Sequence, residues 1–158
     1  MKKDIETLNL KRKLELLVAI LTVFLILFWL YAAGTQISDF NKFKGEMNNQ
    51  VFSNRISRLL AYLIPSSEII IATLLVNRPT RLIGMKMSLL LTLTFSTYII
   101  LALLNVYSRM PCNCAGLMGS NSTWVANLIL NLIVTVVAVT GLIINLKMKE
   151  RRTKVWIQ

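Results

Sequence analysis

The sequence has no histidine, and its 158 residues include only two cysteines, Cys112 and Cys114. General-base catalysis by histidine and a histidine-ligated metal site are therefore excluded. Two thiolates fall short of the about four ligands that a zinc-type site needs, so we expect no metal in a single chain. Acidic residues are also scarce, because seven Asp and Glu stand against 18 Lys and Arg and leave a net charge of +11.

Apolar side chains dominate what is present. They make up 55% of the chain, charged residues make up 16%, and the mean hydropathy is +0.61. A soluble domain of this size cannot bury so much apolar surface, and a disordered chain carries more charge. The basic residues lie at the ends of apolar runs, where they orient helices in a bilayer, so we expect no nucleic-acid binding. The composition predicts a membrane protein.

Four apolar runs are long enough to cross a bilayer as helices, which takes about 20 residues each. We expect spans at about residues 14–34, 59–77, 83–107 and 124–146, in a single membrane domain of residues 1–158. The first run is longer than the about 7–15 apolar residues of a signal-peptide core, so an uncleaved anchor is expected rather than a cleaved signal. The prediction is an all-α integral membrane protein, a bundle of four transmembrane helices.

The basic residues are unequally divided between the two sides of these crossings. Thirteen of the 18 lie on the side with both termini and the loop between the second and third spans. This excess predicts that both termini are cytoplasmic, in a bacterial inner membrane, and that the other loops face the periplasm. Four aromatic residues would then form a belt at the outer interface: Trp29, Tyr31, Tyr107 and Trp124.

The outer segment from Thr35 to Ser57 is too polar to cross the membrane. Its apolar residues nevertheless recur at spacings of three and four, at Ile37, Phe40, Phe43, Met47 and Val51. This pattern predicts a short interfacial amphipathic helix with Ser38 as its N-cap. The helix either connects two spans and rests its apolar face on the bundle, or it docks a partner.

Both cysteines lie in the outer loop between the third and fourth predicted spans, within Arg109-Met110-Pro111-Cys112-Asn113-Cys114-Ala115-Gly116. Disulfides persist outside the cytoplasm, where thiols are not kept reduced. A disulfide across one intervening residue needs a backbone bend, which Pro111 and Gly116 favour, and its strain makes it easy to reduce. Arg109 would stabilise a thiolate. The pattern indicates a thiol–disulfide exchange site, with structural or idle cysteines as the alternative.

Polar residues interrupt two of the spans. Glu68 lies near the middle of the second span, where a carboxylate is costly, so we expect it inside the bundle, protonated or paired. Pro65 frees a backbone carbonyl near Ile64 or Ala61, which two neighbouring serines could satisfy. Glu68 is then either a helix–helix contact or a group that binds or relays a proton to a quinone-like acceptor. In the fourth span Asn127, Asn131 and Thr135 share one face and predict interhelical contacts.

This layout resembles the MauE family of methylamine-utilisation membrane proteins, neighbours of the DoxX-like proteins. The resemblance covers about residues 29–146 and rests on the Phe-rich stretch around residues 40–52, on Leu63-Ile64-Pro65-Ser66-Ser67-Glu68 and on Pro111-Cys112-Asn113-Cys114-Ala115-Gly116. Family members often have Cys-Gly-Cys-Phe-Gly in the last segment, whereas this chain has Asn113 and Ala115.

The resemblance implies a four-span bundle that serves disulfide formation or electron transfer in the periplasm with a thioredoxin-like partner. Cys112 and Cys114 would be the redox pair, while Pro65 and Glu68 match a family segment without an assigned role. Transmembrane thiol relays of similar span number use two cysteine pairs, and this chain has one. Either the single pair meets both the partner and a quinone, or a further protein completes the circuit.

We therefore expect a membrane protein that supports extracytoplasmic thiol–disulfide exchange, as in the maturation of disulfide-containing secreted proteins. One alternative is a non-catalytic scaffold that binds a partner through the outer amphipathic helix, its cysteines being structural. Another is a carrier coupled through Glu68. No residue pattern identifies a cofactor, so a quinone remains a hypothesis.

Overall fold

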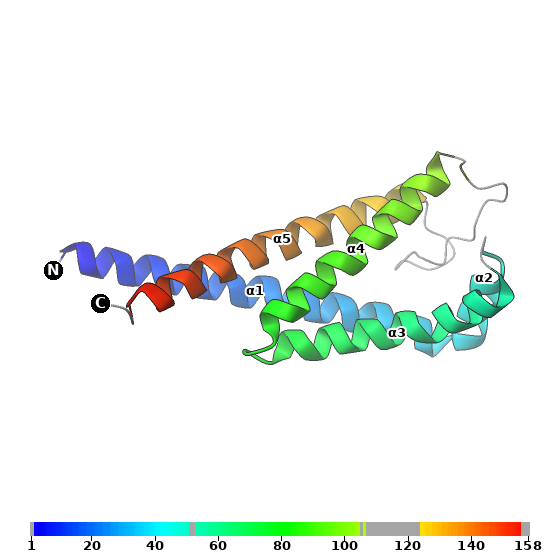
Figure 1. Ribbon diagram of the computed structural model, residues 1–158, viewed down its shortest axis with the longest axis horizontal. Helices are drawn as coiled ribbons and strands as arrows, with labels where there is room; N and C mark the ends of the chain where they lie inside the picture. The colour runs from blue at the N-terminus through cyan, green and yellow to red at the C-terminus, as the bar shows by residue number, and fades with distance from the viewer. Residues whose placement is uncertain (1, 51–52, 105, 107–123, 156–158) are drawn as a thin grey trace.

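The computed structural model describes residues 2–50, 53–104, 106 and 124–155. Within these ranges the chain forms five helices and no strand (Figure 1): α1 (Lys2–Ser38), α2 (Phe40–Asn48), α3 (Asn54–Val76), α4 (Arg81–Leu103) and α5 (Trp124–Val155). Among the described residues, α1, α3, α4 and α5 each contain a stretch long and apolar enough to span a membrane. The predicted all-α membrane fold is confirmed, with a short additional helix.

The long helices form two neighbouring pairs. α1 packs mainly against α3, and α4 packs mainly against α5, while contacts of α3 with α4 and of α1 with α5 join the pairs. Both termini lie at one end of the molecule, which we call the terminal end. The opposite end, here the α2 end, holds α2, the start of α3, the end of α4 and the start of α5 (Figure 1).

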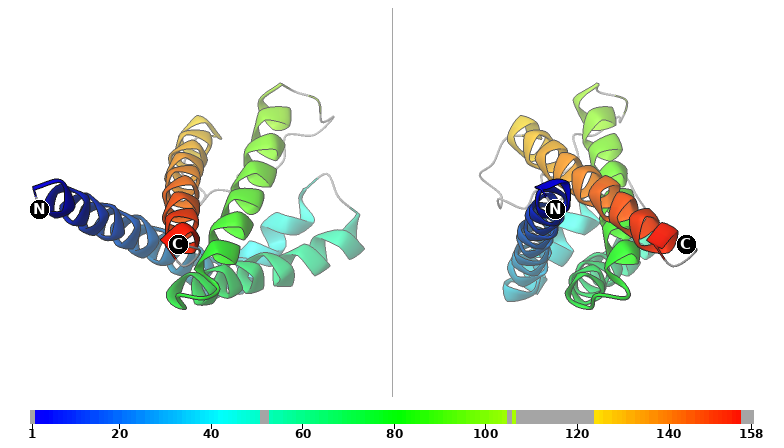
Figure 2. Two further views of the ribbon diagram at one scale, coloured as in Figure 1. Left: turned by 60° about the vertical axis from the view of Figure 1, so that its left-hand side comes forward. Right: turned by 90° about the vertical axis from the view of Figure 1, so that its left-hand side faces the viewer.

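The two pairs are closest near the turn Asn77–Thr80 and separate toward the α2 end, as two views show (Figure 1, Figure 2). Gly84 makes the close approach possible, because an added Cβ would lie 3.0 Å from the backbone nitrogen of Leu75. The hydroxyl of Thr80 donates a hydrogen bond of 2.9 Å to the carbonyl of Leu74 and ties the turn to α3. α3 and α4 are thus held together at the turn and diverge beyond it.

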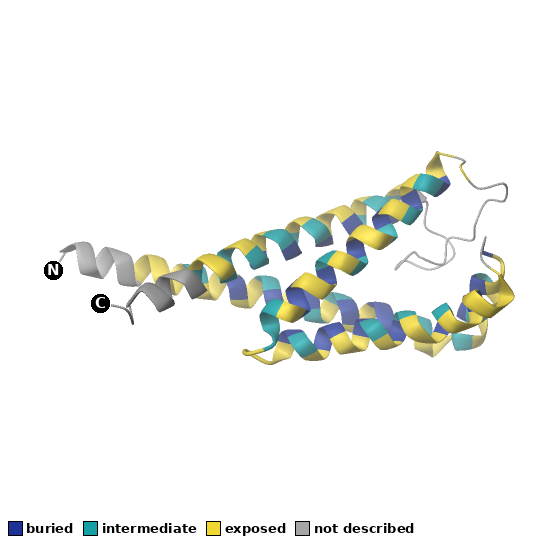
Figure 3. Cartoon of the chain, in the orientation of Figure 1, coloured by how far each residue is buried: buried dark blue, intermediate teal, exposed yellow. Residues whose placement is uncertain are grey.

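Buried positions repeat along one face of each long helix, with exposed positions between them (Figure 3). This is the 3.6-residue periodicity of a helix that packs on one side only. The exposed faces carry many large apolar side chains, which suits contact with lipid rather than water. The apolar core of the bundle consists of Val18, Leu25, Trp29, Ile71, Ala72, Leu75, Met85, Val134 and Ala138.

One member of the predicted aromatic belt belongs to this core instead. The Trp29 side chain is fully buried, and its indole nitrogen donates a hydrogen bond of 2.9 Å to the hydroxyl of Ser88 on α4. The prediction of an interfacial Trp29 is therefore wrong, because a hydroxyl inside the bundle satisfies the N–H that would otherwise seek the interface. Tyr31 is exposed. Tyr107 and the side chain of Trp124 lie outside the described residues.

The N-cap of the short helix α2 is Asp39 rather than the predicted Ser38. The Asp39 carboxylate accepts a hydrogen bond of 3.3 Å from the backbone nitrogen of Lys42, as an N-cap does. Ser38 still belongs to α1, and its hydroxyl donates back to the carbonyl of Gly34 at 2.8 Å. The Ser38 cap was wrongly predicted because α1 continues further than the apolar run indicates.

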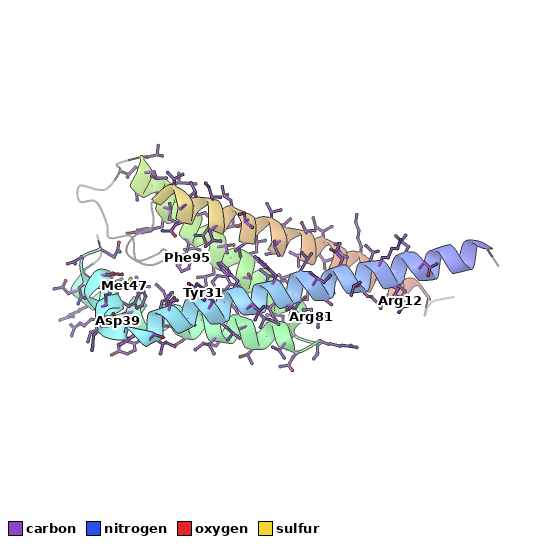
Figure 4. The ribbon with its side chains drawn as sticks, turned by 180° about the vertical axis from the view of Figure 1, so that it is seen from behind. Arg12, Tyr31, Asp39, Met47, Arg81 and Phe95 are labelled. Atoms are coloured by element: carbon purple, nitrogen blue, oxygen red, sulfur yellow. The ribbon has the colours of Figure 1, made fainter. Side chains whose placement is uncertain are left out.

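The apolar face of α2 rests on α3. Phe43 and Met47 are buried and form a small cluster with Ala61. Figure 4 shows Asp39 and Met47 at the α2 end of the molecule. Of the predicted apolar face, Ile37 is instead an exposed residue of α1, and Val51 lies outside the described residues. α2 is therefore a connector whose described apolar residues pack against the bundle.

Candidate functional site

The residues of the predicted exchange site lie outside the described part of the chain. They are Arg109, Pro111, Cys112, Cys114 and Gly116, all between Val106 and the start of α5. The structure does describe the two helix ends that this segment joins, Leu103 at the end of α4 and Trp124 at the start of α5. Both ends lie at the α2 end of the molecule (Figure 1).

The described polar site is centred on Glu68. α3 presents Glu68 on the same face as Ala61, Pro65 and Ile71, and the carboxyl group is fully buried. The side-chain nitrogen of Gln36, on α1, donates a hydrogen bond of 3.1 Å to Glu68 Oε1. The predicted interior position of Glu68 is confirmed, and Gln36 is the partner that the sequence did not identify.

A sequence signal for Gln36 does exist in hindsight. Gln36 follows the buried residue Ala33 by three positions, so it lies on the inward face of α1. Reading it as the partner of Glu68 also requires the register between α1 and α3. That register is set by packing along the whole length of both helices, and the residue pattern of one helix does not determine it.

Pro65 leaves one backbone acceptor of α3 without its helical donor. A proline has no N–H, so the carbonyl of Ala61 loses the bond that residue 65 would supply. Ser67 Oγ donates instead to the carbonyl of Ile64, and Ser66 Oγ to that of Tyr62, each at 2.7 Å. The expected serine bond is therefore confirmed for Ser67 at Ile64, one of the two carbonyls named, whereas Ser66 donates to Tyr62 instead.

Buried polar side chains follow the apolar core directly on the side of the α2 end. Glu68 precedes the core residue Ile71 by three positions, and Asn131 precedes Val134 by three. Together with the half-buried Gln36, we call this set the polar layer: Glu68, Thr92, Ser96, Asn127 and Asn131. Buried polar side chains are therefore interleaved with apolar ones such as Ala33, Ala61 and Ile99 toward the α2 end.

The stripe predicted on the fourth span is buried as expected, since Asn127 and Asn131 are each 1% exposed. Two of its hydrogen bonds stay within α5, from Asn131 Nδ2 to the carbonyl of Asn127 and from Thr135 Oγ1 to that of Asn131. Hydrogen bonds between helices include Gln36–Glu68, Trp29–Ser88 and that from Asn145 Nδ2 on α5 to Met85 Sδ on α4. The hydroxyl of Tyr98 also donates to the side chain of Gln50, two residues beyond the end of α2, and so links α4 to the segment after α2.

Several polar atoms inside the bundle lack a hydrogen-bond partner in the described part of the chain. They are Gln36 Oε1, Ser57 Oγ, Glu68 Oε2, Arg81 Nε, Ser96 Oγ and Asn131 Oδ1. Four of these atoms belong to the polar layer, and two of the four, Gln36 Oε1 and Asn131 Oδ1, can only accept hydrogen bonds. An unpaired buried polar group costs free energy, most of all in a membrane. Acceptor oxygens of the polar layer therefore lack a hydrogen-bond donor among the described residues.

No group of three or more His, Cys, Asp or Glu that could hold a metal ion occurs among the described residues. The described surface does include a shallow hollow on α4, lined by Leu90, Leu93, Thr94, Thr97, Tyr98 and Leu101. Its leucines and threonines lie on the side of α4 opposite the buried residues Ser88, Thr92 and Ser96. The hollow is therefore separate from the polar layer.

One family model matches the chain, described as methylamine utilisation protein MauE, over residues 14–144. The matched range contains Glu68, both cysteines and the apolar parts of all four long helices. No curated protein and no solved structure matches the chain.

Proposed function

Because the chain belongs to the MauE family, we propose that this multi-pass membrane protein exchanges disulfides with an extracytoplasmic thioredoxin-like protein through Cys112 and Cys114. Family membership and four apolar helices set the bilayer as its environment. The exchange chemistry, the partner and the orientation in the membrane are the proposed parts.

The orientation follows from the distribution of basic residues over the two ends of the molecule. Both termini lie at the terminal end, and the turn Asn77–Thr80 is on the same side of the four crossings. Thirteen of the 18 Lys and Arg belong to these segments or flank them. The positive-inside rule then assigns the terminal end to the cytoplasm of a bacterial inner membrane and the α2 end to the periplasm.

The observation that carries the proposal is the position of the cysteines in the chain. Both belong to the segment between Leu104 and Trp124, which is anchored at the α2 end on both sides. With the terminal end in the cytoplasm, the pair is attached on the side where disulfides form and persist. A pair separated by one residue suits an exchangeable disulfide better than a structural one.

In the proposed exchange, a thiolate of the reduced partner attacks one sulfur of the Cys112–Cys114 disulfide. That S–S bond breaks as a mixed disulfide forms, and the partner's second thiolate then releases the chain's sulfur. The partner leaves oxidised, while Cys112 and Cys114 hold two electrons and two protons as thiols. A quinone that takes up both electrons and both protons, becoming a quinol, would restore the disulfide. Such a cycle fits the maturation of disulfide-containing secreted proteins.

The first experiment determines on which side of the membrane Cys112 and Cys114 lie and whether they are oxidised. Intact cells are treated with a membrane-impermeant maleimide, with and without prior reduction, and labelling is scored as a mass shift. We expect labelling only after reduction. The Cys112→Ser/Cys114→Ser double variant is the matched control, because the chain has no other cysteine.

The second experiment tests whether Cys112 or Cys114 forms a mixed disulfide with a thioredoxin-fold protein. Each single variant, Cys112→Ser or Cys114→Ser, is mixed with a purified thioredoxin-fold protein that lacks its resolving cysteine and has been activated as a mixed disulfide. A covalent adduct with one single variant, absent from the double variant, supports exchange. Cysteines that stay reduced in wild-type cells, or that the reagent reaches only after permeabilisation, contradict the proposal and leave a scaffold role.

A further inference from the structure

Positive charge is concentrated at the terminal end of the molecule. Thirteen basic and four acidic residues lie in or beside the terminal segments and the α3–α4 turn, which gives this end a net charge of +9. The rest of the chain carries a net charge of only +2. The positive-inside rule accounts for the side on which basic residues gather, but it does not explain how an individual one is placed. Of the basic side chains described at this end, Arg81 alone is half-buried, and the others are exposed.

Arg81 lies at the level of the lipid headgroups. It is the first residue of α4 and of the apolar span that α4 contains, so it marks where the hydrocarbon region ends. Its Nε is enclosed without a hydrogen-bond partner among the described residues, whereas its two Nη groups are not among the enclosed atoms. Packing therefore holds the stem of Arg81, and the end of the guanidinium group stays accessible. Figure 4 labels Arg81 and Arg12 on the terminal side of Tyr31 and Phe95.

Contacts one helical turn deeper place Arg81 beside α5. Arg81 precedes Met85 by four positions, so the two side chains lie on one face of α4. Met85 Sδ accepts a hydrogen bond of 3.8 Å from Asn145 Nδ2, and a Cβ added at Gly141 would lie 3.2 Å from Met85 Cε. Because α5 runs antiparallel to α4, the residues after Asn145 continue toward the level of Arg81 (Figure 1). Lys147, two positions after Asn145, is exposed there.

These cations have no counter-charge within the part of the chain that the structure describes. No hydrogen bond or ion pair is described there for the side chains of Arg78, Arg81 and Lys147. Among the acidic side chains described, only Glu15 belongs to the terminal end, and it already has an interaction of its own. A guanidinium group that lacks an acceptor favours an anionic oxygen ligand, and phosphate oxygens match its fork of N–H donors.

We propose that Arg81 binds the phosphate group of an anionic phospholipid, with Arg78 and Lys147 supplying further positive charge at the same level. The Nη groups of Arg81 donate to two phosphate oxygens, and the acyl chains lie along the exposed apolar faces of the helices. A net negative headgroup is preferred to a zwitterionic one, because an ammonium group would be repelled by the net charge of +9. No cysteine takes part, so this inference does not depend on thiol–disulfide exchange.

The test measures lipid binding by the full-length protein in detergent with native mass spectrometry. The protein is titrated with phosphatidylglycerol or with phosphatidylcholine of the same acyl chains, and the intensities of the adducts give an apparent Kd for each lipid. We expect phosphatidylglycerol to bind at least about tenfold more tightly. A further arm adds millimolar inorganic phosphate to the phosphatidylglycerol complex. The phosphate should not displace the lipid, because it has no acyl chains to bury against the helices.

Three variants connect the preference to Arg81. Arg81→Gln removes the charge and the N–H fork, and should weaken phosphatidylglycerol binding about tenfold. Arg81→Lys keeps the charge but cannot bind two oxygens at once, so it should weaken binding about threefold. Arg55→Gln is the matched control, because it lowers the net charge by the same amount at an exposed position of the α2 end and should bind the lipid as the wild type does.

A preference for phosphatidylglycerol that Arg55→Gln keeps and Arg81→Gln loses supports the lipid site. Equal affinity of the wild type for the two lipids overturns it. An equal loss in Arg81→Gln and Arg55→Gln also overturns it, because the overall charge then holds the lipid. Displacement of the lipid by inorganic phosphate contradicts the assignment to a phospholipid and indicates a site for the free anion. If Arg81→Gln does not fold, unchanged phosphatidylglycerol affinity in Arg81→Lys counts against the site.

Discussion

Trp29 shows how one side chain can serve the core and a polar contact at the same time. Its ring is among the largest fully buried groups, and its nitrogen reaches across from α1 to Ser88 on α4. Phe28 also packs edge-on against it, with ring centroids 5.1 Å apart. Trp29 therefore links two helices of different pairs just below the polar layer.

We expect Trp29→Phe to lower the free energy of unfolding by about 1–3 kcal/mol. The substitution leaves a small cavity and removes the donor for Ser88 Oγ. Unfolding of the detergent-solubilised protein by SDS measures the change. Ser88→Ala removes the same hydrogen bond without the cavity, so it should cost less. A double variant whose cost equals the sum of the two single costs would show that the bond does not contribute.

Single residues were predictable where one helix face decided the outcome. The inward position of Glu68 and of the asparagine stripe follows from helical spacing within one element. Gln36 as a partner and Trp29 as a core residue were not predictable, because both depend on which residue of another helix lies opposite. The surroundings of Cys112 and Cys114 lie outside the described residues, so that prediction stays a prediction.

Among the elements, α3 and α4 depend on one close contact near their turn. An added Cβ at Gly84 would lie 3.0 Å from both the backbone nitrogen and the side chain of Leu75. A backbone atom in the middle of a helix cannot move aside as the end of a flexible side chain can. Gly84 is therefore required for the approach of the two helices.

We predict that Gly84→Ala lowers the free energy of unfolding by about 1–3 kcal/mol through overpacking. The control is Gly34→Ala on α1, where an added Cβ meets nothing within 4 Å. That change should be neutral or stabilising by up to about 1 kcal/mol, because alanine favours helix. Both are measured by SDS unfolding. Equal effects of the two substitutions would mean that the α3–α4 approach is not tight.

α2 depends on its contact with α3. We expect Phe43→Ala to cost about 3 kcal/mol locally, because Phe43 is buried against Ala61 and a large side chain is lost. Faster hydrogen exchange of the α2 amides, with little change in α5, would report this loss. Asn48→Ala, at an exposed position of the same helix, is the control. Unchanged exchange in Phe43→Ala would indicate that α2 does not need α3.

Element boundaries show the limits of pattern reading. The four apolar runs located the long helices, but α1 continues through Ser38, past the predicted end at residue 34. Hydrophobicity reports where lipid contact ends, whereas a helix ends only where its backbone bonds stop or a cap intervenes. Asp39, and not Ser38, is therefore the N-cap of α2.

At the scale of the whole molecule, the proposed orientation makes a simple prediction. In the Cys112→Ser/Cys114→Ser background, Asn49→Cys at the α2 end should react with an impermeant maleimide in intact cells. Asn77→Cys at the α3–α4 turn should react only after permeabilisation. Both asparagines are exposed, so reactivity reports sidedness rather than burial. The reverse pattern would invert the topology and place the cysteine pair in the cytoplasm.

The number of long helices and their alternation were predictable, because the length of an apolar run sets the number of crossings. How the helices pair was not. α1 packs mainly against α3, and α4 packs mainly against α5. These pairings depend on contacts between residues far apart in the chain. The separation of the two pairs toward the α2 end is likewise a property of the assembled bundle.

Because of that separation, the two helix pairs are in close contact near the α3–α4 turn and free to move apart at the α2 end. α3 and α4 pack closely where Gly84 meets Leu75, and Tyr98 in the far half of α4 donates a hydrogen bond to Gln50, between α2 and α3. A small rotation of α4 against α3 about the Gly84–Leu75 contact displaces the α2 ends of these helices the most. Spreading of the two helix pairs at the α2 end would therefore break the Tyr98–Gln50 hydrogen bond before it disturbed the Gly84–Leu75 contact.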